Sequence, residues 1–253
     1  MKSMQGMSVL ITGGGSGIGA GTARYFARHG ALVTICGRRA DKLQAVAAEI
    51  GPACLAVVGD ITSDSDCSRI VDEAVAHGGG LGALINNAGN MMRGPITDMT
   101  RGALLDVFDT NVVSAMILTG LAVPHLEKTE GAVIFTGSVH TRRAYPGASP
   151  YAATKGAVEV LARVLAAELG PKKIRVNCVL PGAVSTELNI RAGIVTAEQQ
   201  VVRMKALEDS HALGRIGTEE ELAEAIAHLV CAEWTTGASL VVDGGLALGI
   251  SNF

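Results

Sequence analysis

Tyr151 and Lys155 stand four residues apart in SPYAATKGAVEVLARVLAAEL (149–169), a stretch with the apolar spacing of an amphipathic helix. Residues at positions i and i+4 lie on one helix face, so the phenol and the ammonium group are expected to be neighbours. A free phenol has a pKa of about 10, and a lysine charge about 4 Å away is worth on the order of 4 kcal/mol at a dielectric constant of about 20. The spacing therefore predicts a lowered phenol pKa and a general acid/base, although a surface pair has the same spacing.

Two further polar residues stand at unusual places. Ser138 ends the apolar run GAVIFTGS (131–138), which is expected to be a buried strand. Asn111 falls inside a predicted helix from about Arg101 to Leu121, where asparagine is unfavourable and asks for a reason. A packing or helix-bending amide is the alternative interpretation of Asn111. The candidate catalytic group is Ser138, Tyr151, Lys155 and Asn111.

A glycine loop, TGGGSGIG (12–19), follows the first predicted strand and precedes the first helix. Glycine adopts positive φ and lets a backbone approach a ligand closely, and the free N–H groups of a helix N-terminus attract phosphate. At this position the loop predicts a dinucleotide site rather than a plain turn. The candidate contacts are Gly13, Ser16, Gly17, Ile18 and Gly19.

In such sites, the end of the second predicted strand contacts the adenosine ribose, and an acidic residue there favours NAD. Here the strand runs into CGRR, so Gly37 replaces the acid and Arg38 and Arg39 follow. Arginine forms bidentate pairs with phosphate, which predicts NADP with Arg38 as the main contact. Alternatively, both arginines cap or solvate the next helix. Asp60 and Ile61, after the third strand, are expected to flank the adenine.

Short β-rich runs alternate with helical patterns along the chain. Strands are expected at 8–12, 31–36, 54–60, 83–89, 131–138, 174–182 and 238–245. Helices are expected from the glycine loop to about His29, and at 41–50, 65–77, 101–121, 149–169, 197–208 and 219–230. This alternation predicts one α/β domain over 1–253: a single-domain Rossmann fold with a doubly wound, parallel seven-stranded sheet and helices on both faces. Ligands of such sheets bind outside the carboxyl ends of the strands.

The composition narrows the class of protein. The 253 residues are 48% hydrophobic and 18% charged, which is typical of a globular chain. A net charge of −3 without a basic run disfavours nucleic acid or an anionic membrane as partner. The five cysteines have no CxxC spacing, which indicates reduced thiols in a cytoplasmic protein rather than a zinc site or a disulfide framework. We expect no metal, no signal peptide and no membrane span.

In their order and spacing, these motifs resemble those of the short-chain dehydrogenase/reductase family over essentially the whole chain. The resemblance also covers NNAG (86–89), PG (181–182) and VVDGG (241–245). It implies that Tyr151 transfers a proton to or from the substrate oxygen, and that Lys155 lowers the phenol pKa and binds the nicotinamide ribose. It implies that Ser138 orients the reacting group and that Asn111 holds a water that relays protons from Lys155.

The resemblance also implies further cofactor contacts. Asn87, Ala88 and Gly89 would line the cofactor, Pro181, Gly182 and Val184 would pack beside the nicotinamide, and Thr186 would bind its carboxamide or the phosphates. Gly37 departs from the pattern of NAD-dependent members. Ser16 stands where some NADP-dependent members carry a basic residue. The expected cofactor is therefore NADP by preference, with NAD left open.

Three segments are expected to border the substrate, a medium-sized secondary alcohol or ketone: 90–95, 139–149 and a lid at 185–211. Met92 and Met204 offer an adaptable apolar wall, although both fit a plain core. His140 is either a pocket residue or a structural histidine, and Tyr145 is a further candidate contact. Arg142 and Arg143 either recognise an anionic substrate or are solvated or meet a neighbouring subunit.

The resemblance further implies a homotetramer or homodimer that uses helix 151–169 and the last strand. The leading hypothesis is an oxidoreductase. A catalytically inactive dinucleotide-binding sensor or scaffold is the alternative from another class, but such relatives typically lose Tyr or Lys. A nucleotide-sugar epimerase or dehydratase normally has a larger carboxyl-terminal region. Enoyl reduction is disfavoured because those relatives space Tyr and Lys more widely.

Overall fold

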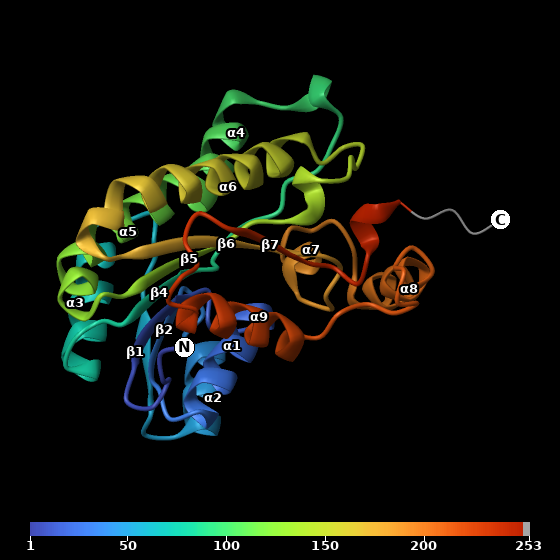
Figure 1. Cartoon of the computed structure of the whole chain (residues 1–253). Coiled ribbons are helices and arrows are strands. Elements are labelled where there is room, and N and C mark those ends of the chain that lie inside the picture. Colours follow the sequence, from blue (N-terminus) through green and yellow to red (C-terminus); the bar gives the residue numbers. More distant parts are fainter. Residues whose placement is uncertain (250–253) are drawn as a thin grey trace.

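The chain folds around one seven-stranded parallel sheet, seen in the computed structural model, which describes residues 1–249 (Figure 1). The strands lie in the order β3-β2-β1-β4-β5-β6-β7. Their bounds are β1 Ser8–Thr12, β2 Leu32–Gly37, β3 Cys54–Val58, β4 Ala83–Asn86, β5 Ala132–Thr136, β6 Arg175–Pro181 and β7 Ser239–Val242. The predicted fold class and all seven strands are confirmed, with ends that differ by a few residues.

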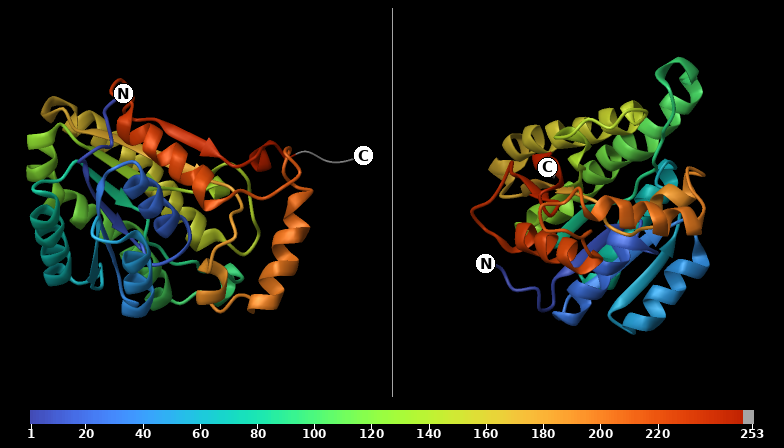
Figure 2. Two further views of the ribbon diagram at one scale, coloured as in Figure 1. Left: turned by 90° about the horizontal axis from the view of Figure 1, so that it is seen from below. Right: turned by 90° about the vertical axis from the view of Figure 1, so that its right-hand side faces the viewer.

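Helices cover both faces of the sheet (Figures 1 and 2). One face carries α1 (Gly17–Arg28), α2 (Ala40–Ile50) and α9 (Glu219–Cys231), with Phe26, Leu43 and Leu222 in its core. The other carries α3 (Asp64–Gly78), α5 (Ser114–Thr129) and α6 (Ser149–Leu169), with Ile70, Leu118 and Val158 in its core. The inner strands are apolar throughout because both of their faces are buried.

The strand order reverses between β1 and β4. The chain builds β1, β2 and β3 in one direction and then returns to place β4 on the other side of β1. The connections that follow β1 and β4 therefore leave the sheet toward opposite faces, which opens a crevice at their carboxyl ends. The glycine loop and residues 87–89 both begin at this crevice.

The predicted continuous helix 101–121 is wrong in detail. The segment is helical from Arg101 to Thr129, but α4 (Arg101–Phe108) and α5 are joined by a π-helical turn at Asp109–Val113 that contains Asn111. Such turns occur often at functional sites. By length and composition alone this segment could cross a membrane, contrary to the sequence expectation, but a core helix passes the same test. Its buried residues pack against the sheet as part of the core.

Two helices stand beyond the carboxyl ends of β6 and β7 (Figure 1). The predicted helix 197–208 is α8 (Ala197–Glu208), which begins with a capping box in which Thr196 and Gln199 exchange hydrogen bonds. The short α7 (Leu188–Arg191) was not predicted from the sequence. Both belong to the segment 185–211 and lie at the edge of the sheet where ligands bind.

Candidate active site

A cleft of about 310 Å³ opens at the carboxyl ends of the strands. It runs from the glycine loop after β1, past the ends of β2 and β3, to the start of α6. Most residues predicted from the sequence line it: Gly13, Ser16, Gly17, Ile18, Arg38, Asp60, Ile61, Asn87, Ala88, Gly89, Ser138, His140, Tyr145, Tyr151, Lys155, Pro181, Gly182, Val184 and Thr186.

The glycine loop has the geometry of a phosphate cradle. Gly13 and Gly17 adopt φ of +67° and +58°, the left-handed region that favours glycine. Ser16, the N-cap of α1, places no side-chain oxygen on the first-turn N–H groups, so these donors face the cleft. Gly19 does not line the cleft, contrary to prediction. A Cβ there would lie 2.4 Å from the Gly13 carbonyl oxygen, so the position requires glycine. Its role is close packing of α1 on the loop.

The loop is tied to the segment after β4. Thr12 Oγ1 accepts hydrogen bonds from the backbone N–H groups of Asn87 (3.0 Å) and Ala88 (2.9 Å). Asn87 Nδ2 donates in return to the Thr12 carbonyl oxygen at 2.9 Å. These bonds across the crevice fix both walls of the site. The shape and donors of the cradle fit a dinucleotide phosphate.

The two arginines after β2 have separate roles. Arg38 lines the cleft, is largely exposed and lies 3.7 Å from the Asp60 carboxylate. Arg39 does not line the cleft, contrary to prediction. Its guanidinium donates to Glu187 (2.7 Å) and to Ser16 Oγ (2.7 Å), and Lys42 pairs with the same Glu187 at 3.3 Å. Arg39 therefore braces the segment after β6 against the glycine loop.

Tyr151, Lys155 and Ser138 come together at the inner end of the cleft, each no more than 6% exposed. The first two lie on one face of α6, as predicted, with Lys155 Nζ 5.6 Å from the centre of the phenol ring. Lys155 Nζ donates to the Thr136 carbonyl oxygen at the end of β5, at 2.7 Å. Ser138 follows the same strand, so β5 and α6 together position the group.

The predicted effect of Lys155 on the phenol is wrong. Burial raises the pKa of Tyr151 to about 12, and a hydrogen bond with Ser138 opposes this rise in part. Burial also lowers the pKa of Lys155 to about 8, because desolvation disfavours its charged form. The spacing argument placed a solvated charge beside the phenol, whereas both groups are buried and the ammonium is directed at Thr136.

Ser138 has a hydrogen-bond partner in His140, whose role the sequence left open. Its Oγ lies 2.9 Å from His140 Nδ1. The imidazole stacks on Tyr145, with ring centres 4.3 Å apart, and meets the Tyr151 ring edge-on at 5.1 Å. Burial, followed by the charges of Arg93 and Arg203, lowers the pKa of His140 to about 4. The histidine is a neutral hydrogen-bonding residue of the pocket.

Asn111 acts through direct contacts from the π-helical turn. Its amide is buried, accepts from the Asn90 backbone N–H (2.7 Å), and donates to the Asn90 carbonyl (2.9 Å) and Thr154 Oγ1 (3.0 Å). It therefore fixes the segment after β4 against α6. Asn111 lines no part of the main cleft, but it borders a cavity of about 10 Å³ together with Lys155. That volume is about the size needed for one water.

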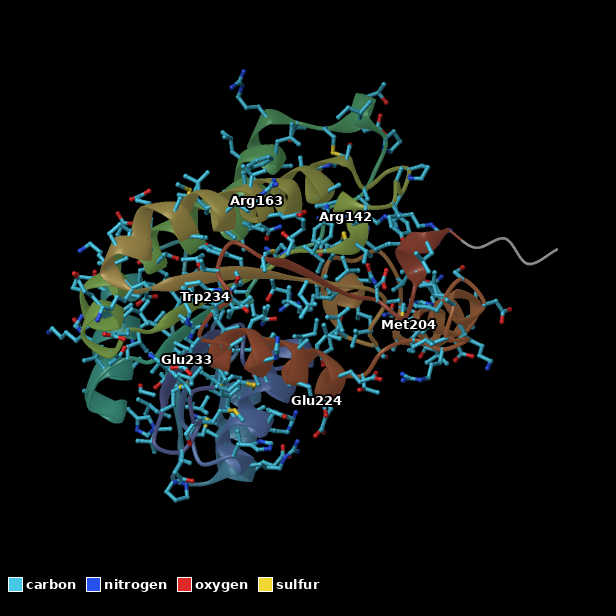
Figure 3. The ribbon with its side chains drawn as sticks, in the orientation of Figure 1. Arg142, Arg163, Met204, Glu224, Glu233 and Trp234 are labelled. Atoms are coloured by element: carbon cyan, nitrogen blue, oxygen red, sulfur yellow. The ribbon has the colours of Figure 1, made fainter. Side chains whose placement is uncertain are left out.

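The substrate end differs from the prediction at Met92, and it decides against a substrate contact for Arg142 and Arg143, the alternative that the sequence had left open. Met91 lines the cleft and Met92 does not, because the irregular segment after β4 turns only the first of the two inward. Arg142 pairs with the buried Glu159 of α6, and Arg143 donates to the Leu246 carbonyl oxygen at 2.8 Å. Neither lines the cleft. Met204 of α8 does line it, and Figure 3 labels both Met204 and Arg142.

Several lining residues were missed by sequence reasoning. Asn90, Glu187, Leu188, Asn189, Arg191, Arg203, Leu207 and Leu246 all contribute. Most fall in the predicted lid segment, whose position in the chain was the available signal. No group of three metal-binding side chains occurs among residues 1–249, and the five cysteines are free thiols.

Comparison with known proteins identifies the class. A family profile described as "Enoyl-(Acyl carrier protein) reductase" matches residues 13–247. The chain is 37% identical to a glucose 1-dehydrogenase of Gluconobacter oxydans over 96% of its length and 92% of that protein. It is 35% identical to an L-fucose dehydrogenase of Bos taurus, with 96% and 90% of the two chains covered.

A solved structure, the 3-ketoacyl-(acyl-carrier-protein) reductase of Brucella melitensis complexed with NADH, superposes with a TM-score of 0.88 at 33% identity and covers 97% of this chain and 100% of that one. Fold, cleft and relatives together define an oxidoreductase with a nucleotide-binding parallel sheet. The chain belongs to the short-chain dehydrogenase/reductase family.

Proposed function

We propose that this protein catalyses NAD(P)-dependent hydride transfer between a nicotinamide ring and a secondary alcohol or ketone, with Tyr151 as general acid/base. The observation that carries the proposal is one continuous cleft with a phosphate cradle at one end and the buried Ser138, Tyr151 and Lys155 at the other. The nicotinamide cofactor supplies or accepts the hydride. The NADH in the Brucella melitensis structure supports this class of cofactor.

The protein orients the reacting group and moves its proton. The Ser138 hydroxyl donates a hydrogen bond to the substrate oxygen and holds it against the phenol. In reduction, Tyr151 donates its proton to that oxygen as the carbonyl carbon becomes tetrahedral. In oxidation, the phenolate removes the hydroxyl proton. Because burial raises the pKa of Tyr151 to about 12, the protonated phenol predominates at neutral pH, and this is the form that donates the proton in reduction.

Lys155 and Asn111 support the proton transfer. Lys155 Nζ lies beside the Tyr151 ring and borders the small cavity that Asn111 also lines. A water in this cavity would restore the phenol proton by way of Lys155. The cavity is bounded by the segment that Asn111 fixes, so the amide maintains its shape.

The proposed cofactor is NADP by preference. Arg38 lines the cleft at the end of β2, beside Gly37, where an acidic residue would repel a 2′-phosphate. Its nearest carboxylate, that of Asp60, lies at the long distance of 3.7 Å, so the guanidinium is able to turn toward a phosphate. Arg39 is occupied by Glu187 and contributes less.

The inactive sensor or scaffold has no observation in its favour, since Tyr151 and Lys155 are both present and buried together.

We also propose a cytoplasmic homotetramer or homodimer that acts on a small molecule. Apolar side chains are exposed on α4, the π-helical turn, α5 and α6: Leu105, Val113, Met116, Ile117, Val160 and Val164. Trp234 (Figure 3), before β7, and Val241, on the edge strand β7, are also exposed. Light scattering of Val164→Glu tests the first surface and should report smaller particles than the parent protein.

The experiment that tests the function is a titration of the purified protein with NADPH and with NADH, followed by nicotinamide fluorescence. A panel of ketones is then screened for oxidation of the bound cofactor. Cofactor binding together with turnover of any ketone supports the proposal. Absence of binding for both cofactors would refute it.

A further inference from the structure

Arg203, at the substrate end of the cleft, and Arg93, in a separate hollow, lack a carboxylate partner among residues 1–249. Arg203 belongs to α8, and Arg93 to the segment after β4. Among residues 1–249, no acidic side chain lies within 4.0 Å of either guanidinium. Arg203 Nε is buried without a hydrogen-bond partner, and Arg93 uses one nitrogen on the Pro146 carbonyl oxygen at 3.3 Å. Buried donors of this kind normally have a partner.

Arg203 lies at the reacting end of the cleft, whereas Arg93 lines a separate hollow with Gly94 and Gly147. Arg203 lines the same cleft as Ser138, His140 and Tyr151. The charges of Arg93 and Arg203 both lower the pKa of His140, whose ring contacts Tyr151. The charge of Arg203 also lowers the pKa of Arg93, after burial. Both charges therefore act on the imidazole that holds Ser138, but only Arg203 lines the cleft.

The cations at the cofactor end are arranged differently. Arg39 and Lys42 share Glu187, and Arg38 faces Asp60. Arg191 donates to the Gly89 carbonyl oxygen (2.9 Å), and its pKa is lowered by burial and then by the charges of Arg39 and Arg38. Arg191 thus lies among the cations of the cofactor end of the cleft. Arg203, supplemented by the charge of Arg93, forms a second positive site without a carboxylate among residues 1–249.

Two partly desolvated like charges repel each other and are costly without a counter-charge. We propose that the substrate carries an oxyanion group, a carboxylate or a phosphate, which Arg203 binds while the substrate carbonyl or hydroxyl lies against Ser138 and Tyr151; the charge of Arg93 adds to the attraction from outside the cleft lining. The Tyr145 hydroxyl, buried without a partner on the same wall, supplies a further donor. This inference rests on the proposed function and names its substrate class as oxo acids or keto phosphates.

The anion site is not the one considered from the sequence. Arg142 is neutralised by Glu159, and Arg143 donates to the Leu246 carbonyl oxygen. Neither guanidinium is therefore available to bind an anion in the cleft. Guanidinium groups bind carboxylate and phosphate in bidentate fashion, which gives both affinity and orientation. Met91, Met204 and Leu207 line the cleft as well and would contact the aliphatic part of the substrate.

Matched anionic and neutral ketones test the proposal. 4-Oxopentanoate is compared with its methyl ester, 3-oxobutanoate with its methyl ester, and dihydroxyacetone phosphate with dihydroxyacetone, each with NADPH and with NADH. For at least one pair, kcat/KM of the anion is expected to exceed that of its neutral partner about 100-fold. Whether the preferred anion is an oxo acid or a keto phosphate shows whether the site binds a carboxylate or a phosphate. Equal or better turnover of every neutral partner would overturn the anion site and leave the proposed function intact.

Variants localise the effect. Arg203→Met is expected to lower the anion-to-neutral ratio of kcat/KM about 100-fold, mainly through KM, and Arg93→Met to lower it about 10-fold. Lys205→Met removes a cation from the exposed face of the same helix and is the matched control, for which the ratio should stay at the parent value. An equal loss for both partners in Arg203→Met would indicate a structural role and contradict the proposal.

If no ketone is reduced, binding measurements test the anion site separately from the proposed hydride transfer. The protein loaded with NADPH or NADH is titrated by calorimetry with 4-oxopentanoate, its ester, dihydroxyacetone phosphate and dihydroxyacetone. Binding of an anion, weak or absent for its neutral partner and abolished in Arg203→Met, supports the anion site even where hydride transfer fails. No preference for either anion overturns it.

Discussion

The Ser138 hydroxyl lies 2.9 Å from Nδ1 of His140, and the same imidazole meets the ring of Tyr151 edge-on. One neutral side chain therefore sets the direction of the serine hydroxyl and packs against the phenol. His140→Ala is expected to lower kcat about 10-fold, since Ser138 loses its orientation, while His140→Gln retains a hydrogen-bonding group and recovers part of the loss. Steady-state kinetics with the best ketone measures both.

The exposed His228 on α9 provides the matched control, as His228→Gln should behave like the parent protein. Because burial lowers the pKa of His140 to about 4, the ring stays neutral above about pH 5, and no inflection near pH 6.5 should arise from it. An inflection there that disappears in His140→Gln would contradict the neutral role.

The pH dependence should differ between the two directions. Alcohol oxidation needs the phenolate of Tyr151, whose pKa is about 12, so log kcat/KM should rise by about one per pH unit up to pH 8. Above the pKa of Lys155, about 8, loss of the ammonium proton offsets this gain and the oxidation profile levels. Ketone reduction uses the protonated phenol, so its profile should be flat to pH 8 and then fall.

Initial-rate profiles from pH 6 to 10 in both directions check these signs. Lys155→Met should lose the inflection near pH 8 along with most activity. A plateau of the oxidation profile below pH 7 would indicate a phenol with a low pKa in the free protein. That result would favour the argument from the Tyr–Lys spacing over the buried geometry.

Arg38 is expected to select the phosphorylated cofactor. Arg38→Ala should weaken NADPH binding roughly 10- to 100-fold, the loss of one or two charge-assisted hydrogen bonds, and should change NADH binding little. Arg39→Ala should change the NADPH-to-NADH ratio less, because Glu187 holds Arg39. Fluorescence titrations measure all four affinities. Equal weakening of both cofactors in Arg38→Ala would refute a phosphate contact.

Asn111 is expected to contribute to stability as well as activity. Asn111→Ala leaves the Asn90 N–H, the Asn90 carbonyl and the Thr154 hydroxyl without this partner. The free energy of unfolding should fall by about 2–4 kcal/mol. Urea unfolding at equal protein concentrations measures this loss, with Gln44→Ala, an exposed change on α2, as control. A loss for Asn111→Ala no larger than that of the control would show that the amide is not a brace.

Periodicity was sufficient for the sheet and for most helices. Parallel strands buried on both faces give continuous apolar runs, so β1 to β7 could be found from the sequence alone. The glycine loop, Ser138 and Tyr151 could then be placed at one edge of the sheet. The chemistry of their residue types, together with that placement, was enough to predict that they line one cleft.

Contacts between residues far apart in the chain determine the features of the site that the sequence could not predict. Glu187 takes Arg39 out of the cofactor site from 148 positions away, and no local pattern signals this pairing. The π-helical turn around Asn111 depends on its bonds to Asn90 and Thr154. The phenol pKa depends on burial, which spacing along a helix does not report. Arg203 stands in an ordinary amphipathic helix, and only the fold brings it to the cleft.

The central claim is that Tyr151 transfers the proton, and Tyr151→Phe tests it most directly. The variant removes one oxygen and keeps the ring that packs on His140. The account predicts that NADPH and NADH affinities stay within about twofold of the parent, while kcat for the best ketone falls by about 10²–10⁴-fold. Undiminished turnover in Tyr151→Phe, with the cofactor bound, would contradict the account.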